Sequence, residues 1–212
     1  MKLKEIFETK KKNQRLYQTS CPVIGLTGGI ATGKSSVSKK MTELGIGVIC
    51  ADKLVKGIYQ REEAFNFIKE SFPSAVNDQG INFKKLREIA FNSEKDKKRL
   101  EEFIYERLPD AFSQEYSKLE NKEVLVYDVP LLFEKKLEDN FDLIICVYTS
   151  KDEQVKRVMQ RDSITKELAE KIISNQMPIG EKKERADFAI DNEKDLMHLD
   201  LEIEALCTIL FE

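Results

Sequence analysis

A glycine-rich segment from Gly28 to Ser35 carries the residues best suited to chemistry. Its letters, GGIATGKS, satisfy the pattern GxxxxGK[ST], and it lies between a short apolar run and a charged helical stretch. Glycines let successive backbone N–H groups converge on phosphates, and the following helix points its positive dipole end at the same place. Lys34 supplies a mobile positive charge for the outer phosphates, and the Ser35 hydroxyl is a Mg2+ ligand. The sequence therefore predicts a phosphate-binding loop.

The rest of the chain narrows the class of nucleotide protein. A guanine-reading N-K-x-D sequence is missing, since Asn192-Glu193-Lys194-Asp195 has the wrong spacing, and no D-x-x-G switch follows the third apolar run. The chain also lacks an LSGGQ-like signature and is short for a motor or transporter ATPase. These observations disfavour a regulatory GTPase and a large ATPase, and they favour a small phosphoryl-transfer enzyme.

Two aspartates follow apolar runs and are the candidate catalytic carboxylates. Ligands of doubly wound sheets bind beyond the carboxyl ends of the strands, where Asp52 and Asp128 are expected. Asp52 can accept the proton of an acceptor hydroxyl in line with the γ-phosphate, and Asp128 can hold Mg2+ directly or through water. The alternatives are a helix N-cap for Asp52 and a strand-end turn residue for Asp128.

Basic residues gather in and after the helix that follows the fourth apolar run. Mobile guanidinium groups that close over a transferring phosphoryl group neutralise its charge and exclude water. Arg157 and Arg161, four apart on one helical face, are the pair predicted to do so. The further basic residues of this cluster, each of which is also compatible with a solvated surface, are Lys166, Lys171, Lys182, Lys183 and Arg185.

Short apolar runs alternate with helical segments along the chain. This alternation predicts a parallel sheet with helices on both faces, a doubly wound α/β fold. The predicted strands are 23–26, 46–51, 124–127, 143–148 and 188–190. The C-terminal apolar positions Leu196, Leu199, Ile203, Leu206 and Leu210 recur at helical spacing and are predicted to be helix core.

The chain is expected to divide into three parts. Residues 1–21 read as a basic arm that is solvated or loosely docked. Residues 22–62 and 120–212 form the sheet core, and residues 63–119, far more than one crossover helix needs, form a helical insertion. Glu63 to Ser71, Phe83 to Phe91 and Ser93 to Leu119 are its predicted helices.

Composition bounds the possible partners and location. With 41% hydrophobic and 34% charged residues the chain supports a folded core with a solvated surface. A net charge of −3 argues against a protein that holds nucleic acid or a membrane by its overall field. The four cysteines have no CxxC spacing, and no apolar run approaches a membrane span or a signal peptide, so a cytoplasmic protein is expected.

Four stretches of the sequence resemble the dephospho-CoA kinase family. They are IGLTGGIATGKSSVSKKMTELGIGVICADKLV (24–55), VLVYDVPLLFE (124–134), VKRVMQRD (155–162) and ISNQMPIGEKKERADFAIDN (173–192). Small kinases share single motifs among them, but their order is specific to this family. The resemblance implies ATP-dependent phosphorylation of the ribose 3'-hydroxyl of dephospho-CoA, the last step of coenzyme A synthesis.

The resemblance also implies the roles of the site. It implies a P-loop core, a helical insertion (63–119) that binds the acceptor dephospho-CoA, and a closing lid from about Ser163 to Arg185. Asp52 would be the general base, Lys34 would hold the phosphates, Arg157 and Arg161 would contact ATP, and Ser35 and Asp128 would bind Mg2+. The residues predicted to bind ATP are Gly29, Ile30, Ala31, Thr32, Gly33, Lys34, Ser35 and Ser36.

The sequence departs from the family at three places. The family usually shows D-A-D where this chain has Cys50-Ala51-Asp52, so the second carboxylate, which matches the base, is kept. The His-Pro of the family's helical insertion appears here as Tyr105-Glu106, and Ala31 stands where the loop commonly has a third glycine.

Two other functions remain open from the sequence. One is a nucleoside monophosphate or other small-metabolite kinase, which acceptor screening would separate. The other, motivated by Cys50 and the missing His-Pro, is a nucleotide-dependent switch without catalysis, which would bind ATP without acceptor-stimulated ADP release.

Overall fold

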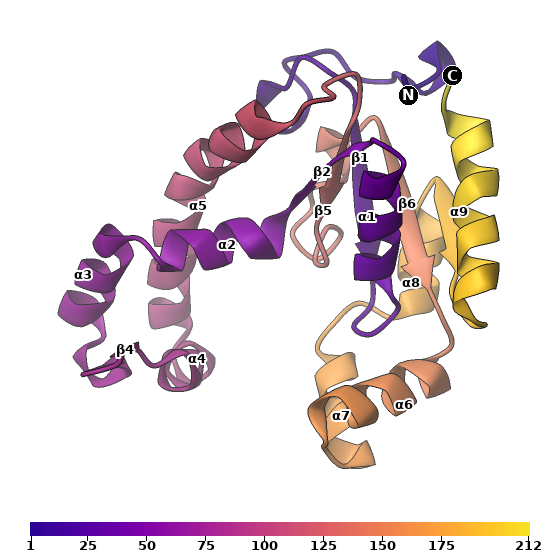
Figure 1. Cartoon of the computed structure of the whole chain (residues 1–212). Coiled ribbons are helices and arrows are strands. Elements are labelled where there is room, and N and C mark those ends of the chain that lie inside the picture. Colours follow the sequence, from indigo (N-terminus) through magenta and orange to yellow (C-terminus); the bar gives the residue numbers. More distant parts are fainter. The chain divides into compact units, whose positions relative to one another are not determined.

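Five parallel strands form the central sheet of the computed structural model, which describes residues 1–212 (Figure 1). The sheet order is β2-β5-β1-β6-β7, so the strand that enters the glycine-rich loop is the middle one. Every residue of β1 and β5 is buried, which explains why these strands are apolar runs without alternation. The predicted parallel α/β sheet is confirmed. The strands are β1 Val23–Gly28, β2 Gly47–Cys50, β5 Leu125–Asp128, β6 Leu143–Tyr148 and β7 Phe188–Asp191.

Helices cover both faces of this sheet. Val37 and Met41 of α1 and Leu199 and Ile203 of α9 share one core with the strands, whereas α8 packs against β6 and β1. A Cβ on Gly25 would lie 2.7 Å from Leu132, so residues 129–141 also approach the sheet closely. No helix of the structure combines the length and the apolar character that a membrane span requires. The helices are α1 Lys34–Glu43, α6 Lys151–Asp162, α7 Lys166–Ser174, α8 Ile179–Arg185 and α9 Leu196–Leu210, with 3-10 turns at Glu5–Phe7, Leu16–Gln18 and Glu138–Asn140.

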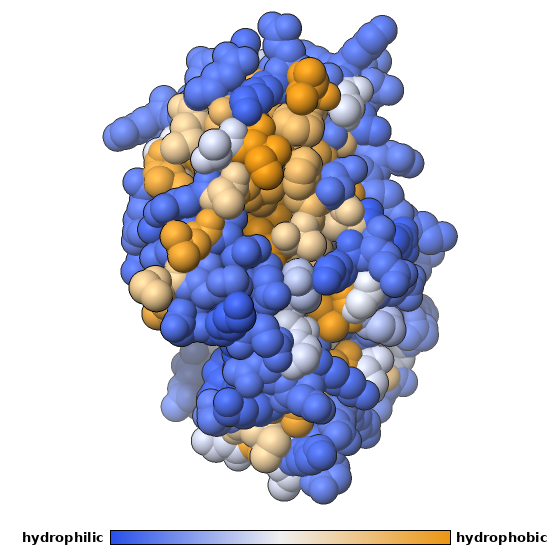
Figure 2. Space-filling model, turned by 90° about the vertical axis from the view of Figure 1, so that its right-hand side faces the viewer, coloured by the Kyte–Doolittle hydropathy of each residue, from blue (hydrophilic) through white to orange (hydrophobic).

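Helix α9 buries four of the five positions of its predicted core stripe. The fifth, Leu196, is 71% exposed, because it is the first residue of the helix, directly after the N-cap Asp195. The opposite side of α9 is also apolar, with Met197, Leu201 and Ile209 exposed. Figure 2 shows the side of the molecule on which α9 lies. Apolar surface is gathered in the upper half of this view.

The residues from Ala51 to Lys118 form a second compact unit. It begins earlier than the predicted insertion of residues 63–119, because α2 packs against α5. Its core contains Ile68, Phe72, Leu86 and Leu100. The elements are α2 Ala51–Tyr59, α3 Glu62–Ser71, a 3-10 turn Pro73–Ala75, a hairpin of β3 Val76–Asn77 and β4 Gly80–Ile81, α4 Phe83–Asn92 and α5 Glu94–Lys118.

The N-terminal arm is docked on the sheet unit, one of the two alternatives predicted from its basic composition, and its contacts are buried rather than loose. Leu3 is fully buried and forms a β-bridge with Phe211, and Lys4 Nζ donates to two carbonyls at the end of α9. Arg15, 8% exposed, makes a two-point ion pair with the buried Asp142. Composition missed this contact because the arm has one buried charge whose partner lies 127 residues away.

Candidate active site

The glycine-rich loop joins β1 to the N-terminus of α1. Gly33 is the N-cap of α1 with φ of 90°, a left-handed conformation that favours glycine. A Cβ at Gly33 would lie 1.9 Å from Asn192 Nδ2, so a side chain is also excluded there for lack of space. Lys34 and Ser35 are the first two helical residues, where backbone N–H groups lack acceptors within the helix. The loop and the α1 dipole therefore form a cradle whose geometry suits an anion, at the place where the sequence predicts a phosphate-binding loop.

Lys34 and Asp128 meet beside this cradle. Asp128 is the last residue of β5, in register with Leu26 of β1, and it is only 2% exposed. Its Oδ1 is ion-paired with Lys34 Nζ, and its Oδ2 accepts a hydrogen bond of 2.7 Å from Ser38 Oγ. The parallel pairing of β1 and β5 thus brings together the lysine of the loop that follows β1 and the carboxylate at the end of β5. A buried carboxylate beside the first turn of α1, which carries the Ser35 hydroxyl, is a donor set that suits a hard divalent cation.

The two predicted arginines lie on α6 but have different surroundings. Arg157 donates from Nε to Glu153 Oε1 at 2.9 Å and from a terminal nitrogen to the carbonyl of Asn192 at 2.9 Å. Arg161 makes a two-point ion pair with its neighbour Asp162, and its side chain is 55% exposed. Arg157 is therefore tied to the segment after β7, whereas Arg161 reaches into solvent.

The basic residues of α8 are engaged in structural contacts, unlike a mobile, solvated cluster. Lys182 is fully buried, and its Nζ lies 2.8 Å from both the carbonyl of Pro130 and Glu134 Oε1. Lys183 Nζ lies 3.8 Å above the ring of Tyr148. Arg185 is paired with Glu138.

Three amide side chains that the sequence reasoning did not single out hold the glycine-rich loop. Gln176 Oε1 accepts from the N–H of Ile30 at 2.9 Å, and Gln154 Nε2 donates to the carbonyl of Ile30 at 2.8 Å. Asn192 Nδ2 donates to the carbonyl of Thr32 at 2.7 Å. Gln176 and Asn192 lie in the segments NQMP and FAIDN, which contribute to the family resemblance. The sequence assigned no role to either residue.

Asp52 lies in the first turn of α2, in the second unit. It follows Cys50 by two residues, and Cys50 is in register with Asp128 at the carboxyl end of the sheet. Its carboxylate is exposed, which a base that meets a substrate hydroxyl requires. The expected N-cap role does not apply, because α2 begins at Ala51 and Asp52 is already helical.

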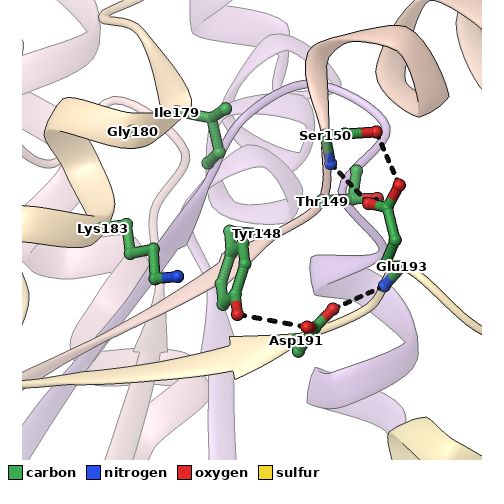
Figure 3. A pocket seen from close by; sticks show the side chains of 8 residues that line it. All are labelled: Tyr148, Thr149, Ser150, Ile179, Gly180, Lys183, Asp191 and Glu193. Carbon is green, nitrogen blue, oxygen red and sulfur yellow. Dashed lines mark hydrogen bonds between the residues drawn. The ribbon is translucent and has the colours of Figure 1, made fainter.

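A pocket of about 360 Å³ lies at the carboxyl ends of β6 and β7 (Figure 3). Tyr148 and Lys183 line one part, and Tyr148 donates to Asp191 on its floor. The Glu193 carboxylate accepts from the hydroxyls of Thr149 and Ser150 and from the backbone N–H of Ser150. These hydrogen bonds lower the pKa of Glu193 to about 2, so this rim of the pocket is anionic. None of the residues 28–36 lines it.

Comparison with known proteins identifies relatives over most of the chain. The family model for dephospho-CoA kinase matches residues 22–198. The dephospho-CoA kinase of Fusobacterium nucleatum is 37% identical over 190 residues, which cover 89% of this chain and 98% of that protein.

Two solved structures extend the likeness to the fold. A Thermus thermophilus protein superimposes with a TM-score of 0.81 and 29% identity, covering 91% of this chain and 99% of that one. The dephospho-CoA kinase of Campylobacter jejuni gives a TM-score of 0.63 and 31% identity over 88% of this chain and 95% of that one. The predicted fold class and phosphotransferase function are confirmed by these matches. The chain belongs to the dephospho-CoA kinase family, the ATP-dependent kinases of coenzyme A synthesis.

Proposed function

We propose how this chain carries out its family's reaction, transfer of the γ-phosphoryl group of ATP to the ribose 3'-hydroxyl of dephospho-CoA. The hydroxyl oxygen attacks the γ-phosphorus, the bond to the β–γ bridging oxygen breaks, and ADP leaves. The observation that carries the proposal is the cradle at the N-terminus of α1, with Lys34 and the buried Asp128 beside it. The products of the reaction are ADP and coenzyme A, a 3'-phosphorylated nucleotide.

The loop residues Gly29 to Ser36 bind the phosphates of ATP in this proposal. Backbone N–H groups of the loop and of the first turn of α1 point at the anion, and Lys34 exchanges its contact with Asp128 for the outer phosphates. Ser35 and Asp128 would hold Mg2+, which when bound would supply positive charge beside the phosphates. Because Asp128 is buried, its carboxylate would need that positive charge once Lys34 turns to the phosphates.

Asp52 is the proposed general base. It receives the proton of the 3'-hydroxyl as the oxygen attacks, which raises the nucleophilicity of that oxygen. The neighbouring helices α3 to α5 belong to the same unit as Asp52, and we propose that this unit binds the acceptor. The ribose hydroxyl would thus be held by the unit that also supplies its base.

Arg157 and Arg161 are the proposed contacts to the transferring phosphoryl group and to ATP. Negative charge spreads over the equatorial oxygens in the transition state, and guanidinium groups stabilise it while water is excluded. We propose that the predicted lid, about Ser163 to Arg185, closes together with α6, which carries both arginines.

The reaction is tested by ADP release from ATP and Mg2+ with different acceptors. We expect dephospho-CoA to stimulate release, and AMP, dTMP, shikimate and buffer without acceptor to give only the background rate. Turnover of another acceptor instead of dephospho-CoA would show that the fold is right and the substrate wrong. Silence with every acceptor would show that the chain is not catalytic.

The role of Asp52 is tested by the variant Asp52→Asn. We expect kcat to fall by about 10²- to 10⁴-fold, the usual range for a general base, while ATP binding stays within about twofold. Asp78→Asn is the matched control, because Asp78 is an exposed aspartate of the same unit, in the turn between β3 and β4. A kcat of Asp52→Asn equal to that of the control would rule out Asp52 as the base.

A further inference from the structure

Ile30 of the glycine-rich loop is held on both of its backbone polar groups by glutamine side chains. Gln154, on α6, donates to its carbonyl, and Gln176, two residues beyond α7, accepts from its N–H. Gln154 is 2% exposed, so its hydrogen bond is shielded from water. The helix pair α6–α7 (residues 151–174), with the residues that follow it, therefore holds the backbone of Ile30 by both of its polar groups.

The side chains of the loop pack against the same helices. Ile30 and Ala31 contact the buried cluster that Val155, Val158 and Ala169 of α6 and α7 form. Ala31 has φ of 59°, a left-handed conformation that is unusual for a residue other than glycine. Glycine would relieve the backbone there but would lose the methyl group that meets the cluster. The departure from the family's third glycine thus adds apolar contact between the loop and α6–α7.

These hydrogen bonds also determine which N–H groups of the loop remain available to donate to a phosphate. An N–H that already donates to Gln176 does not donate to a phosphate oxygen at the same time without weakening both bonds. The peptide plane of residue 30 is pinned by this bond, and the carbonyl of Thr32 is pinned by Asn192. Between these two anchors only a narrow range of loop conformations remains, so the N–H groups of the later loop residues are preorganised.

One atom of this arrangement is unsatisfied. Gln154 Oε1 is buried and has no hydrogen-bond partner, while a Cβ on Gly29 would lie 2.4 Å from Gln154 Nε2. An unpaired buried acceptor against the loop is a group that another conformation of the loop can satisfy. The structure therefore contains two hydrogen bonds that fix the loop in its present conformation and one buried acceptor that a shifted loop can satisfy.

We propose that Gln176 and Gln154 are positioning residues that couple the arrangement of α6–α7 to the conformation of the phosphate-binding loop. When α6–α7 lies as it does here, Ile30 is locked and the loop is ordered for a nucleotide. When α6–α7 moves away, both hydrogen bonds and the contact with the apolar cluster are lost together, and the loop loosens. Nucleotide affinity is then linked to the position of the helix that carries Arg157 and Arg161.

This inference rests on the proposed nucleotide site, and the test separates the two. The variant Gln176→Met keeps the length of the side chain and removes the acceptor for the Ile30 N–H. We expect the dissociation constant for ADP with Mg2+ to rise about three- to tenfold, the range for losing one partly buried neutral hydrogen bond. The KM for the acceptor should stay within about twofold of the wild-type value. A general loss of stability would not weaken ADP binding while leaving the acceptor KM unchanged. Wild-type protein that binds no ADP would remove the proposed nucleotide site itself.

A second readout is independent of activity. Hydrogen exchange of the Ile30 amide, followed on loop peptides without nucleotide, should become at least about tenfold faster in Gln176→Met. Gln160→Met is the matched control, because Gln160 is an exposed glutamine on α6. Gln154→Met removes the other hold on Ile30 and should weaken ADP binding in the same direction, which keeps the test available if Gln176→Met does not fold. Unchanged exchange and ADP affinity in Gln176→Met would overturn the coupling.

Discussion

The ion pair between Arg15 and Asp142 fastens the N-terminal arm to the sheet unit, and removing Arg15 should destabilise the fold. The side chains are 7% and 0% exposed, and the guanidinium meets both carboxylate oxygens, at 2.8 and 3.1 Å. Asp142 also accepts from the backbone N–H groups of Val23, at the start of β1, and of Lys10. The arm lies outside residues 22–198, the part of the chain that the family model matches.

The expected loss follows from what Arg15→Ala leaves behind. Removing one partner of a buried ion pair costs about 3–5 kcal/mol, because the other charge stays buried and unpaired. Asp142 keeps two backbone N–H donors, so we expect a loss of stability at the lower end of this range, about 3 kcal/mol. For a chain of this size 1 kcal/mol corresponds to about 2–4 °C, so the melting temperature should fall by about 6–12 °C.

Thermal and urea unfolding of Arg15→Ala, Arg15→Lys and Lys12→Ala measure this effect. Lys12 is an exposed cation of the same arm and serves as the control, with an expected change within about 0.5 kcal/mol. Arg15→Lys keeps the charge but loses the two-point geometry, so an intermediate melting temperature is expected. All variants should retain kcat well below their melting temperatures, because the arm meets the start of β1 and the loop lies at its other end. A melting temperature of Arg15→Ala equal to that of Lys12→Ala would refute the reasoning.

Two further predictions concern titrating groups. Glu193 has its pKa lowered from 4.5 to about 2 by hydrogen bonds from Ser150 and Thr149, so it stabilises the folded state fully above pH 4.5 and loses this contribution as the pH falls toward 2. Glu193→Gln should therefore unfold more easily than wild type at neutral pH, with a gap that narrows below about pH 4.5 in urea titrations; a constant gap would contradict this. Burial raises the pKa of Cys146 to about 12, so iodoacetamide should alkylate the half-buried Cys50 first, and mass spectrometry that finds Cys146 equally modified would disprove this order.

The sequence predicted the features whose causes are local. A strand, a glycine turn and a helix N-terminus are each specified by neighbouring residues, so the loop from Gly28 to Ser35 and the place of Lys34 followed from spacing alone. The pairing of Lys34 with Asp128 was not predicted, although both were expected at the carboxyl edge of the sheet, where neighbouring parallel strands end. Three helices of the second unit, α3, α4 and α5, were predicted to within about two residues, whereas α2 was not predicted as part of this unit.

The features that the sequence missed depend on partners far along the chain. Nothing near Arg15 indicates that it is buried, because its partner Asp142 lies in the loop before β6. Lys182 belongs to a run of charged residues that is typical of a solvated face, yet the sheet and Glu134 enclose it completely. Gln154 matches no motif, and Gln176 lies in the segment NQMP, to which the sequence assigned no role, so only the folded structure shows that both reach Ile30.

Arg157 and Arg161 show how contacts divide residues that the sequence treats alike. They are one turn apart on α6, and their spacing gave them a single predicted role. Arg157 is already placed by Glu153 and the carbonyl of Asn192, so it can act with little rearrangement of its side chain. Arg161 is held only by an exposed pair with Asp162, an interaction that contributes about 0–1 kcal/mol. Releasing it would cost little beside the charge of a triphosphate, so under the proposed lid closure Arg161 is the arginine that we expect to reach the nucleotide.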